Sequence, residues 1–512
     1  MSAPDKTRRD FLKAVGVGAA AMVSSIDNTT GKTGAKKQLL TVDPRPRFDL
    51  SPYLYMQFME PLGTTDGSVA AAWDFRTNRW RPDVVQVTRD LAPTMIRWGG
   101  CFSSYYKWKE AVGPRDKRKP MINLLWGGIE TNQVGTAEFV DFCRQVKADP
   151  LMSVNFESDG RKGWMKDPFG SVRCGDAREA GEWVDYCNNR TNSLRLSHGH
   201  KDPLRIPFWQ IGNETSHSKK GFDCETAAAK TVEFAKSMRK ADPSIKIIGW
   251  GDRGWARRMI EVAGEHLQYI AIHHMFRPDR GQKDSPLQGT EYRKDPARTW
   301  AHLMKAYEAH EQKIKNACEQ VKGLGIPLAL TECHFALPGR NRCEVLSSWA
   351  AGVSYARFMN VHLRYGELLK IGTLADFCGT RWQVNAVMIP VPRGKSFLMP
   401  VAKVMKFYRE HMGSSFVQVQ RVPDGLDVAA NRRDNTIILH VINTKRLRSI
   451  TVDLGVEGHK IQSGKVYEMA TDPEFEVISA MPDPLVPKVK QLNGSNWTFP
   501  AASVSAVELD II

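Results

Sequence analysis

The sequence lacks the long apolar runs and paired cysteines that mark membrane proteins and disulfide-stabilised domains. Its nine cysteines are an odd number and include no Cys-x-x-Cys pair, so neither a disulfide framework nor a zinc site is indicated. No apolar run reaches the roughly 20 residues that a membrane helix needs. Zinc-finger spacing, aromatic ribonucleoprotein signatures and basic helices with heptads are absent too, which argues against a nucleic-acid partner.

The 512 residues carry a clear excess of positive charge and enough apolar residues for a large core. Lysine and arginine number 72 against 56 acidic residues, which gives a net charge of +16. Such a surface attracts anionic partners or substrates, although a basic composition alone identifies none. No internal repeat is present.

The N-terminal stretch "TRRDFLKAVGVGAAAMVSS" resembles a twin-arginine export signal. Arg8 and Arg9 precede a short run rich in alanine and glycine, which is too short to span a bilayer. We therefore expect a cleaved signal over residues 1–25, a periplasmic or secreted protein, and no stable membrane insertion. A cytosolic protein with a chance arginine pair is the alternative.

Eight short apolar runs are spaced along the chain and read as buried parallel strands, with amphipathic segments between several of them. The runs cover residues 52–58, 94–97, 151–155, 206–212, 246–250, 269–273, 327–331 and 369–374. Strands that alternate with helices over about 330 residues predict an α/β fold, a (β/α)8 TIM barrel with elaborated loops.

The sequence pattern changes near residue 400. From there on, short segments with the alternation typical of β-strands, such as "NTIILHVIN", are separated by turn residues. We therefore expect a catalytic barrel over residues 48–398 and a C-terminal β-sandwich over 399–512. Residues 26–47 are predicted to be a linker or the N-terminal strand of that sandwich.

Two carboxylates follow predicted strands closely. Glu214 comes after "WQIGN" at the end of the fourth run, and Glu332 comes after "PLALT" at the end of the seventh. The carboxyl ends of barrel strands converge on one face, where catalytic groups lie. Glycoside hydrolysis needs two such carboxyl groups. Either glutamate alone is more simply explained as a salt-bridged acid, but the pair favours catalysis.

Further motifs arrive in a specific order, namely "LYMQFMEPLG", "MIRWGG", "ETNQVGTAEFVDFC", "REAGEWVDYCN", "FWQIGNE" and, near the end, "WTFPAASVSAVEL". In this order they resemble the α-L-arabinofuranosidases of glycoside hydrolase family 51, within the retaining enzymes of clan A. The resemblance covers about residues 50–512. It implies a barrel packed on a β-sandwich and catalysis that needs no metal or organic cofactor.

The resemblance also implies roles for individual residues. Glu214 matches the acid/base and Glu332 the nucleophile of a retaining mechanism, while Asn213 matches the residue that holds the sugar 2-hydroxyl. Glu60 matches a glutamate that binds sugar hydroxyls. Arg97 matches the arginine that supports the catalytic carboxylates, for which an ordinary structural ion pair is the alternative.

Two departures from the family pattern bear on the substrate. The family usually shows Arg, an aromatic, Pro, Gly, Gly, Asn, whereas this chain has Trp98 followed by two glycines and Cys101. We keep Trp98 and Cys101 as substrate-binding positions, although a sugar-binding amide is missing. The family's His-x-Tyr becomes His273, His274 and Met275, which removes a phenol. His273 is expected near the acid/base, with a packed histidine as the alternative.

Two short runs, His273–His274 and Glu332–Cys333–His334, contain residue types that bind metals. Neither is accompanied by His-x-x-x-His or paired acid spacing. No catalytic metal is therefore predicted.

These observations predict an exo-acting α-L-arabinofuranosidase that acts on plant or algal polysaccharide or oligosaccharide. The basic loop "GPRDKRKP", residues 113–120, raises an acidic glycan as a hypothesis, with a solvated charge run as the simpler reading. An endo-acting or uronate-directed glycanase and a non-catalytic carbohydrate-binding protein stay open. Relatives in this family often assemble into hexamers or trimers, so a homo-oligomer is also open.

Overall fold

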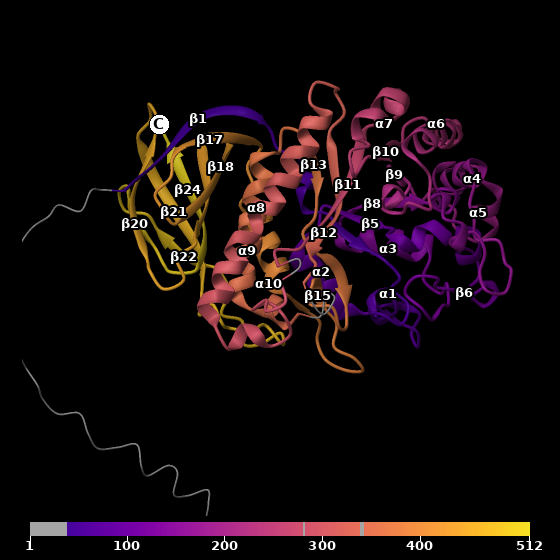
Figure 1. Ribbon diagram of the computed structural model, residues 1–512, viewed down its shortest axis with the longest axis horizontal. Helices are drawn as coiled ribbons and strands as arrows, with labels where there is room; N and C mark the ends of the chain where they lie inside the picture. The colour runs from indigo at the N-terminus through magenta and orange to yellow at the C-terminus, as the bar shows by residue number, and fades with distance from the viewer. Residues whose placement is uncertain (1–37, 280–281, 338–342) are drawn as a thin grey trace, which may run out of the picture. The chain divides into compact units, whose positions relative to one another are not determined.

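The computed structural model describes residues 38–279, 282–337 and 343–512, in which helices and two large sheets make a mixed α/β fold (Figure 1). The predicted signal segment, residues 1–25, lies outside the described residues, as does most of the predicted linker. Within the described ranges, no helix is both long and apolar enough to cross a membrane. The predicted α/β class is confirmed.

The larger sheet has eleven strands, and eight of them run parallel to their neighbours in chain order. These eight are β2 (Gln57–Met59), β5 (Met95–Trp98), β8 (Asp149–Val154), β9 (Phe208–Ile211), β10 (Lys246–Trp250), β11 (Tyr269–Phe276), β12 (Leu328–Phe335) and β13 (Leu369–Gly372). Three residues after β13 the chain enters β14 (Asp376–Gly379), which pairs with β2 at the opposite end of this order. The sheet continues through β15 (Asn385–Met388) and β16 (Phe397–Leu398).

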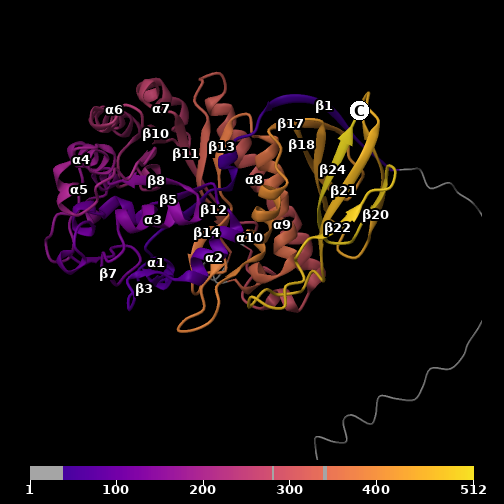
Figure 2. The ribbon, with the colours of Figure 1, turned by 180° about the vertical axis from the view of Figure 1, so that it is seen from behind.

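Helices connect the parallel strands and cover their outer side. They are α1 (Ser68–Ala72), α2 (Pro82–Leu91), α3 (Thr136–Val146), α4 (Ala177–Asn188), α5 (Ser193–Ser197), α6 (Cys224–Ala241), α7 (Ala256–Ala263), α8 (Pro296–Val321), α9 (Trp349–Arg364) and α10 (Pro400–Glu410). Both ribbon views draw α4, α6 and α7 along the outside of β8 to β10 (Figures 1 and 2). Helix neighbours pack on each other, α4 on α6, α6 on α7, and α8 on α9.

Local sequence signals fix where the main helices begin. Asp223 accepts a hydrogen bond from the backbone N–H of Thr226 and caps α6, and Asp295 caps α8 in the same way through Arg298. These caps satisfy N–H groups that have no partner inside the helix. Pro296 at the first position of α8 fits because its missing N–H is not needed there.

Each parallel strand, or its immediate start, contributes at least one buried apolar residue to a small cluster that is separate from the main core. Members of this inner layer are Met56, Met95, Leu151, Phe208, Ile248, Trp250, Ala271, Ala329 and Ile371. Side chains alternate between the two faces of a strand, so their neighbours in sequence point outward and pack under the helices. The polar residues of the candidate site lie on the inner face, further along the same strands.

The smaller sheet has nine strands in the order β22-β21-β24-β19-β18-β17-β1-β20-β23. Their bounds are β1 (Leu39–Asp49), β17 (Ser415–Arg421), β18 (Leu426–Arg433), β19 (Thr436–Asn443), β20 (Ile450–Val456), β21 (Ile461–Ala470), β22 (Lys488–Gln491), β23 (Asn496–Phe499) and β24 (Ser503–Ile511). The strands enclose an apolar core of their own. Strand β1 enters this sheet from the other end of the chain and pairs with β17 and β20.

The two sheets meet through α9 and α10. Asp427 on β18 accepts hydrogen bonds from Arg357, Asn360 and Arg364 on α9. Trp349 donates its indole N–H to the carbonyl of Ala502 at 2.7 Å. Helix α10, which falls within the range predicted as sandwich, packs on α9 and α2 of the larger sheet's layer.

Two short hairpins lie outside both sheets. Strands β3 (Trp73–Asp74) and β4 (Arg79–Trp80) form one, and β6 (Met121–Ile122) and β7 (Ile129–Glu130) form the other. The first predicted strand, residues 52–58, is only partly correct. Residues Pro52–Tyr55 form a 3₁₀ turn because the Ser51 hydroxyl accepts the N–H of Tyr53, and β2 begins at Gln57.

Candidate active site

The residues expected to act together lie at the carboxyl ends of four parallel strands. Arg97 is on β5, His273 on β11 and Glu332 on β12, whereas Asn213 and Glu214 follow β9. The pairing of β11 with β12 places His273 directly opposite Glu332, so these two residues are neighbours. Glu332 lies inside its strand rather than after it, since β12 continues to Phe335.

Arg97 is the hub of the site and is fully buried. Its guanidinium donates from Nη1 to Glu332 Oε1 at 2.8 Å, from Nη2 to Asn213 Oδ1 at 2.6 Å, and from Nε to Gln210 Oε1 at 2.9 Å. A rigid planar fork of this kind fixes several acceptors at once. Arg97 therefore positions Glu332 and Asn213 relative to each other.

Glu214 has a left-handed backbone, with φ 51° and ψ 31°, which side-chain-bearing residues rarely adopt. The surroundings enforce this turn. Arg161 donates to the carbonyl oxygen of Glu214 at 2.6 Å, and the buried carboxylate of Asp159 accepts the backbone N–H of Asn213 and the hydroxyl of Thr215. The chain thus reverses directly after β9 and directs the Glu214 side chain toward Glu332.

The Glu214 carboxylate contacts two histidines. His217 Nδ1 lies 3.1 Å and His273 Nδ1 lies 3.3 Å from Glu214 Oε1. Burial tends to raise the pKa of this carboxyl, but the hydrogen bonds from His217 and His273 outweigh burial and hold the pKa well below its ordinary value. In this arrangement Glu214 is a carboxylate.

His217 is held on its other side by Asp252, whose Oδ2 lies 2.9 Å from His217 Nε2. Burial opposes a charge on the ring, but Asp252 and Glu214 together raise the pKa of His217 to about 9. Lys313 on α8 bonds the second oxygen of Asp252. A chain of alternating charges thus runs from Lys313 through Asp252 and His217 to Glu214.

Glu214 and Glu332 approach each other closely. His273 Nδ1 lies 3.3 Å from Glu214 Oε1 and 3.5 Å from Glu332 Oε2, and one oxygen of each glutamate and this nitrogen all lie within 4.8 Å of one another. The second ring nitrogen of His273 bonds the hydroxyl of Thr331 at 3.0 Å. The three groups could hold a cation in principle, but the Arg97 guanidinium already neutralises Glu332.

Glu60, one residue after β2, is buried beside the pair. It accepts hydrogen bonds from the backbone N–H of Phe102 and the indole of Trp126, each at 2.8 Å. Burial, and then the negative charge of Glu332, raises the pKa of Glu60 well above its ordinary value. The rings of Trp126 and Trp382 pack edge to face, with their centroids 5.4 Å apart.

The two positions taken from the altered motif differ in their placement. Cys101 lies at the site, with Sγ 3.6 Å from Glu214 Oε2 and 3.7 Å from Asn213 Nδ2. Trp98 is separated from it, because its ring is buried on the outer side of β5 against Phe102 and Phe139. Successive residues on a strand face opposite sides, so Arg97 and Trp98 cannot both face the site.

His217, Asp252 and Asp159 are site residues that sequence reasoning missed. Asp252 carried a usable signal, because it follows "KIIGWG" at the end of the fifth run just as Glu214 follows the fourth. His217 ends a short 3₁₀ turn, Thr215–His217, that carries no periodic signal, and only its position three residues after Glu214 could have suggested contact.

Comparisons with known proteins agree with these motifs. A model of the alpha-L-arabinofuranosidase 1 domain matches residues 87–295. An intracellular exo-alpha-(1->5)-L-arabinofuranosidase of Halalkalibacterium halodurans is 30% identical over 47% of this chain and 47% of that protein. Alpha-L-arabinofuranosidase C of Emericella nidulans is 34% identical over 35% of this chain and 33% of that protein. The chain thus matches about a third to a half of the length of these curated relatives.

Solved structures show the same fold over nearly the whole chain. The family 51 arabinofuranosidase from Xanthomonas axonopodis pv. citri has a TM-score of 0.76 at 20% identity and covers 92% of this chain and 99% of its own. The alpha-L-arabinofuranosidase from Thermotoga maritima, solved as an arabinose complex, has a TM-score of 0.72 at 23% identity, with 92% and 99% covered. The predicted resemblance to family 51 α-L-arabinofuranosidases is confirmed.

Proposed function

We propose that this protein is a retaining glycoside hydrolase, an exo-acting α-L-arabinofuranosidase, in which Glu332 is the nucleophile and Glu214 the acid/base. The observation that carries the proposal is the approach of the two glutamates, with an oxygen of each within 4.8 Å, at the ends of β9 and β12. Retaining glycosidases hold their carboxyl groups about 5 to 5.5 Å apart, and inverting enzymes about 6.5 to 9.5 Å apart to admit water. The close approach supports retention.

The proposal includes a closed barrel and a β-sandwich. Closure is supported by the inner layer, to which each of the eight strands or its immediate start contributes, and by the pairing of β14 with β2 just after β13. A barrel interior is filled by such layers. The self-contained core of the smaller sheet supports a sandwich.

In the first step, an oxygen of Glu332 forms a bond to the anomeric carbon while the bond from that carbon to the leaving oxygen breaks. Arg97 orients Glu332 for this attack, because its Nη1 bonds Oε1 and leaves Oε2, 3.5 Å from His273 Nδ1, as the oxygen that attacks. In the second step, water attacks the anomeric carbon, gives its proton to Glu214, and releases Glu332 as a carboxylate.

The leaving oxygen needs a proton in the first step, and Glu214 is a carboxylate before substrate binds. His217 supplies that proton in our proposal, since its Nδ1 lies 3.1 Å from Glu214 and its pKa is raised to about 9. The proton moves from His217 to Glu214 to the leaving oxygen, and the second step returns one proton from water. Asp252 stabilises the charged ring before the transfer.

The choice of arabinofuranose rests on the printed names of the relatives, which include an exo-acting alpha-(1->5)-L-arabinofuranosidase. Cys101 stands where the family pattern has a sugar-binding asparagine, and its Sγ lies 3.6 Å from Glu214 Oε2, so discrimination at this point of the pocket differs in our proposal. Export by the twin-arginine route, to the periplasm or the medium, stays part of the proposal.

The acidic-glycan alternative was based on the positive charge of the loop of residues 113–120, and two arginines of this loop are engaged within the protein. Arg118 is buried and makes a bidentate pair with Glu138. Arg115 bonds the same glutamate and lies over the ring of Trp73. These two cations serve the fold, so they are not available to a polysaccharide.

The test is product release from an aryl α-L-arabinofuranoside and from a panel of pectic, xylan and sulfated algal glycans. Glu332→Ala should abolish turnover. Glu214→Ala should regain activity with azide and form an arabinosyl azide of retained configuration. Glu476→Ala, which removes a carboxylate that bonds Arg293 and Tyr292, serves as the matched control and should stay active.

Full activity in Glu332→Ala would refute the assigned nucleophile. Activity on another glycan alone would keep the mechanism and reject the substrate, and mixed linear oligosaccharide products would indicate endo action. Binding across the panel without turnover would favour a non-catalytic carbohydrate-binding protein.

A further inference from the structure

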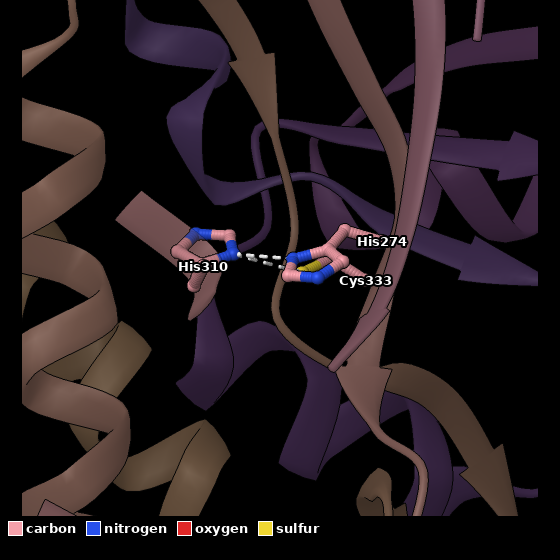
Figure 3. A group of neighbouring side chains, drawn as sticks. All are labelled: His274, His310 and Cys333. Atoms are coloured by element: carbon pink, nitrogen blue, oxygen red, sulfur yellow. Dashed lines mark hydrogen bonds between the residues drawn. The ribbon is translucent and has the colours of Figure 1, made fainter. Parts of the chain in front are cut away.

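A second group of ligating side chains lies on the outer face of the same two strands that carry His273 and Glu332. His274 on β11 and Cys333 on β12 each follow a site residue, and they are partners in the strand register. Because successive side chains alternate, both face away from the site and toward α8, which contributes His310 (Figure 3).

Three potential ligand atoms converge in this group. His274 Nδ1 and His310 Nδ1 lie 3.0 Å apart, and Cys333 Sγ lies 3.9 Å from the same nitrogen of His310. All three atoms fall within 4.8 Å of one another. Figure 3 shows the two rings turned toward each other with the sulfur beside them.

These separations match the spacing of ligands around one metal ion. Bonds of about 2.0 to 2.1 Å to nitrogen and about 2.3 Å to sulfur place the ligand atoms of a trigonal or tetrahedral site about 3.3 to 3.8 Å from each other. The observed 3.0 and 3.9 Å bracket that range. The third separation, between Cys333 Sγ and His274 Nδ1, is at most 4.8 Å, so the side chains need move by no more than about 1 Å to surround one cation.

A further histidine supports the orientation of His310. His310 Nε2 lies 3.0 Å from His362 Nε2 on α9. When the Nε2–H of His310 donates to His362, its Nδ1 keeps a lone pair directed at His274 and Cys333. Metal-bound histidines commonly use their second nitrogen in this way, which fixes the ring and its tautomer.

The surroundings select the charge of the ion. Phe276 and Phe358 pack edge to face against the buried ring of His310, so this side of the group is apolar, and the nearby charge of Lys313 is paired with Asp252. A single thiolate and two neutral imidazoles neutralise a monovalent cation completely, whereas a divalent ion keeps one positive charge in this apolar setting. An uncompensated buried charge is costly.

We propose that His274, His310 and Cys333 form a binding site for a thiophilic d¹⁰ cation, and that it takes Cu⁺ in preference to Zn²⁺. Thiolate and imidazole ligands suit both ions, and the charge balance favours the monovalent one. The bound ion would join β11, β12 and α8 directly behind the proposed active site. The site is independent of the proposed glycosidase activity.

The experiment uses the full chain, reduced and stripped of metal, without oxygen. The protein is offered Cu⁺ or Zn²⁺ in competition with a chromogenic chelator, and retained metal is measured after desalting. Because eight other cysteines can bind copper, Cys333→Ser is compared with Cys143→Ser, which alters another buried cysteine, on α3. His274→Gln is a second variant, in which only a half-buried ring changes.

We expect the wild type and Cys143→Ser to retain about one Cu⁺ more per chain than Cys333→Ser and His274→Gln. Copper should also raise the melting temperature of the wild type and leave that of Cys333→Ser unchanged, since an ion that binds only the folded state stabilises it. Equal copper retention in wild type and Cys333→Ser would overturn the proposal. Tighter retention of Zn²⁺ than of Cu⁺ would overturn it as well.

Discussion

His217 gives the sharpest prediction, because its charge depends on two carboxylates, Glu214 and Asp252, that the structure brings together from two separate segments. The perturbation is His217→Gln, which keeps a polar side chain between Glu214 and Asp252 but cannot carry a charge. In the wild type the two carboxylates raise the pKa of the ring from 6.5 to about 9. The ring lies mostly buried, so solvent screens these contacts little.

The size of the effect follows from linkage. The pKa difference, 9 − 6.5 = 2.5, corresponds to about 3 kcal/mol of stability at about 1.36 kcal/mol per unit. The folded-state pKa is raised, so this stabilisation is fully present below pH 6.5 and is lost as the pH rises through about 9. The free energy of unfolding of the wild type should therefore fall by about 3 kcal/mol relative to His217→Gln between pH 6 and pH 10.

The assay is urea unfolding of both proteins across that pH range. Groups that titrate in both proteins cancel in the difference, and His459→Gln, at an exposed loop, is a control that should show no such trend. A difference between wild type and His217→Gln that stays constant from pH 6 to pH 10 would refute the charged ring. It would also remove the proton source that we propose for Glu214.

Three further changes probe other parts of the argument. Arg97→Met leaves Glu332 buried without its cation and should cost about 3 to 5 kcal/mol in denaturant unfolding; a cost below 1 kcal/mol would contradict the hub role of Arg97. Asp427→Ala removes the carboxylate that pairs with two α9 arginines, Arg357 and Arg364, and should lower the unfolding free energy by about 3 kcal/mol, with an unchanged unfolding midpoint as the contrary result. Cys101→Asn restores an amide beside Glu214 and should raise kcat/KM for an aryl arabinofuranoside about tenfold, the equivalent of one hydrogen bond; a decrease would show that the cysteine fits the true substrate better.

The periodic part of the fold could be predicted from the sequence. Apolar runs bounded by turn residues located the eight parallel strands within a few residues, because burial on both faces leaves a continuous hydrophobic signal. Residues 52–55 were misassigned, since a single serine hydroxyl at residue 51 decided the local turn. Strand β14 carried no comparable signal, because it continues a strand after an irregular break.

The site residues that follow an apolar run could be predicted from the sequence, because such runs mark where strands end. Glu214 and Glu332 follow apolar runs, and strand direction alone brings them together. His217 was not accessible in this way, since it follows no apolar run and meets Asp252 only after two loops have folded. The direction of the Trp98 side chain was knowable from strand alternation, once Arg97 was assigned to the inside.

Strand β1 sets a condition on how the molecule is made. Leu39 pairs with Asp453, so 453 − 39 = 414 residues separate two partners in the same sheet. At about 5 to 20 residues per second, the ribosome needs about 20 to 80 s to deliver the second partner after the first. During that interval the backbone N–H and C=O groups on one edge of β1 have no native partner strand. Exposed strand edges of this kind can pair with other chains and cause aggregation. The smaller sheet is therefore the last part of the nascent chain to fold. Strand β1 is the segment that a chaperone has to keep from aggregating for the longest time.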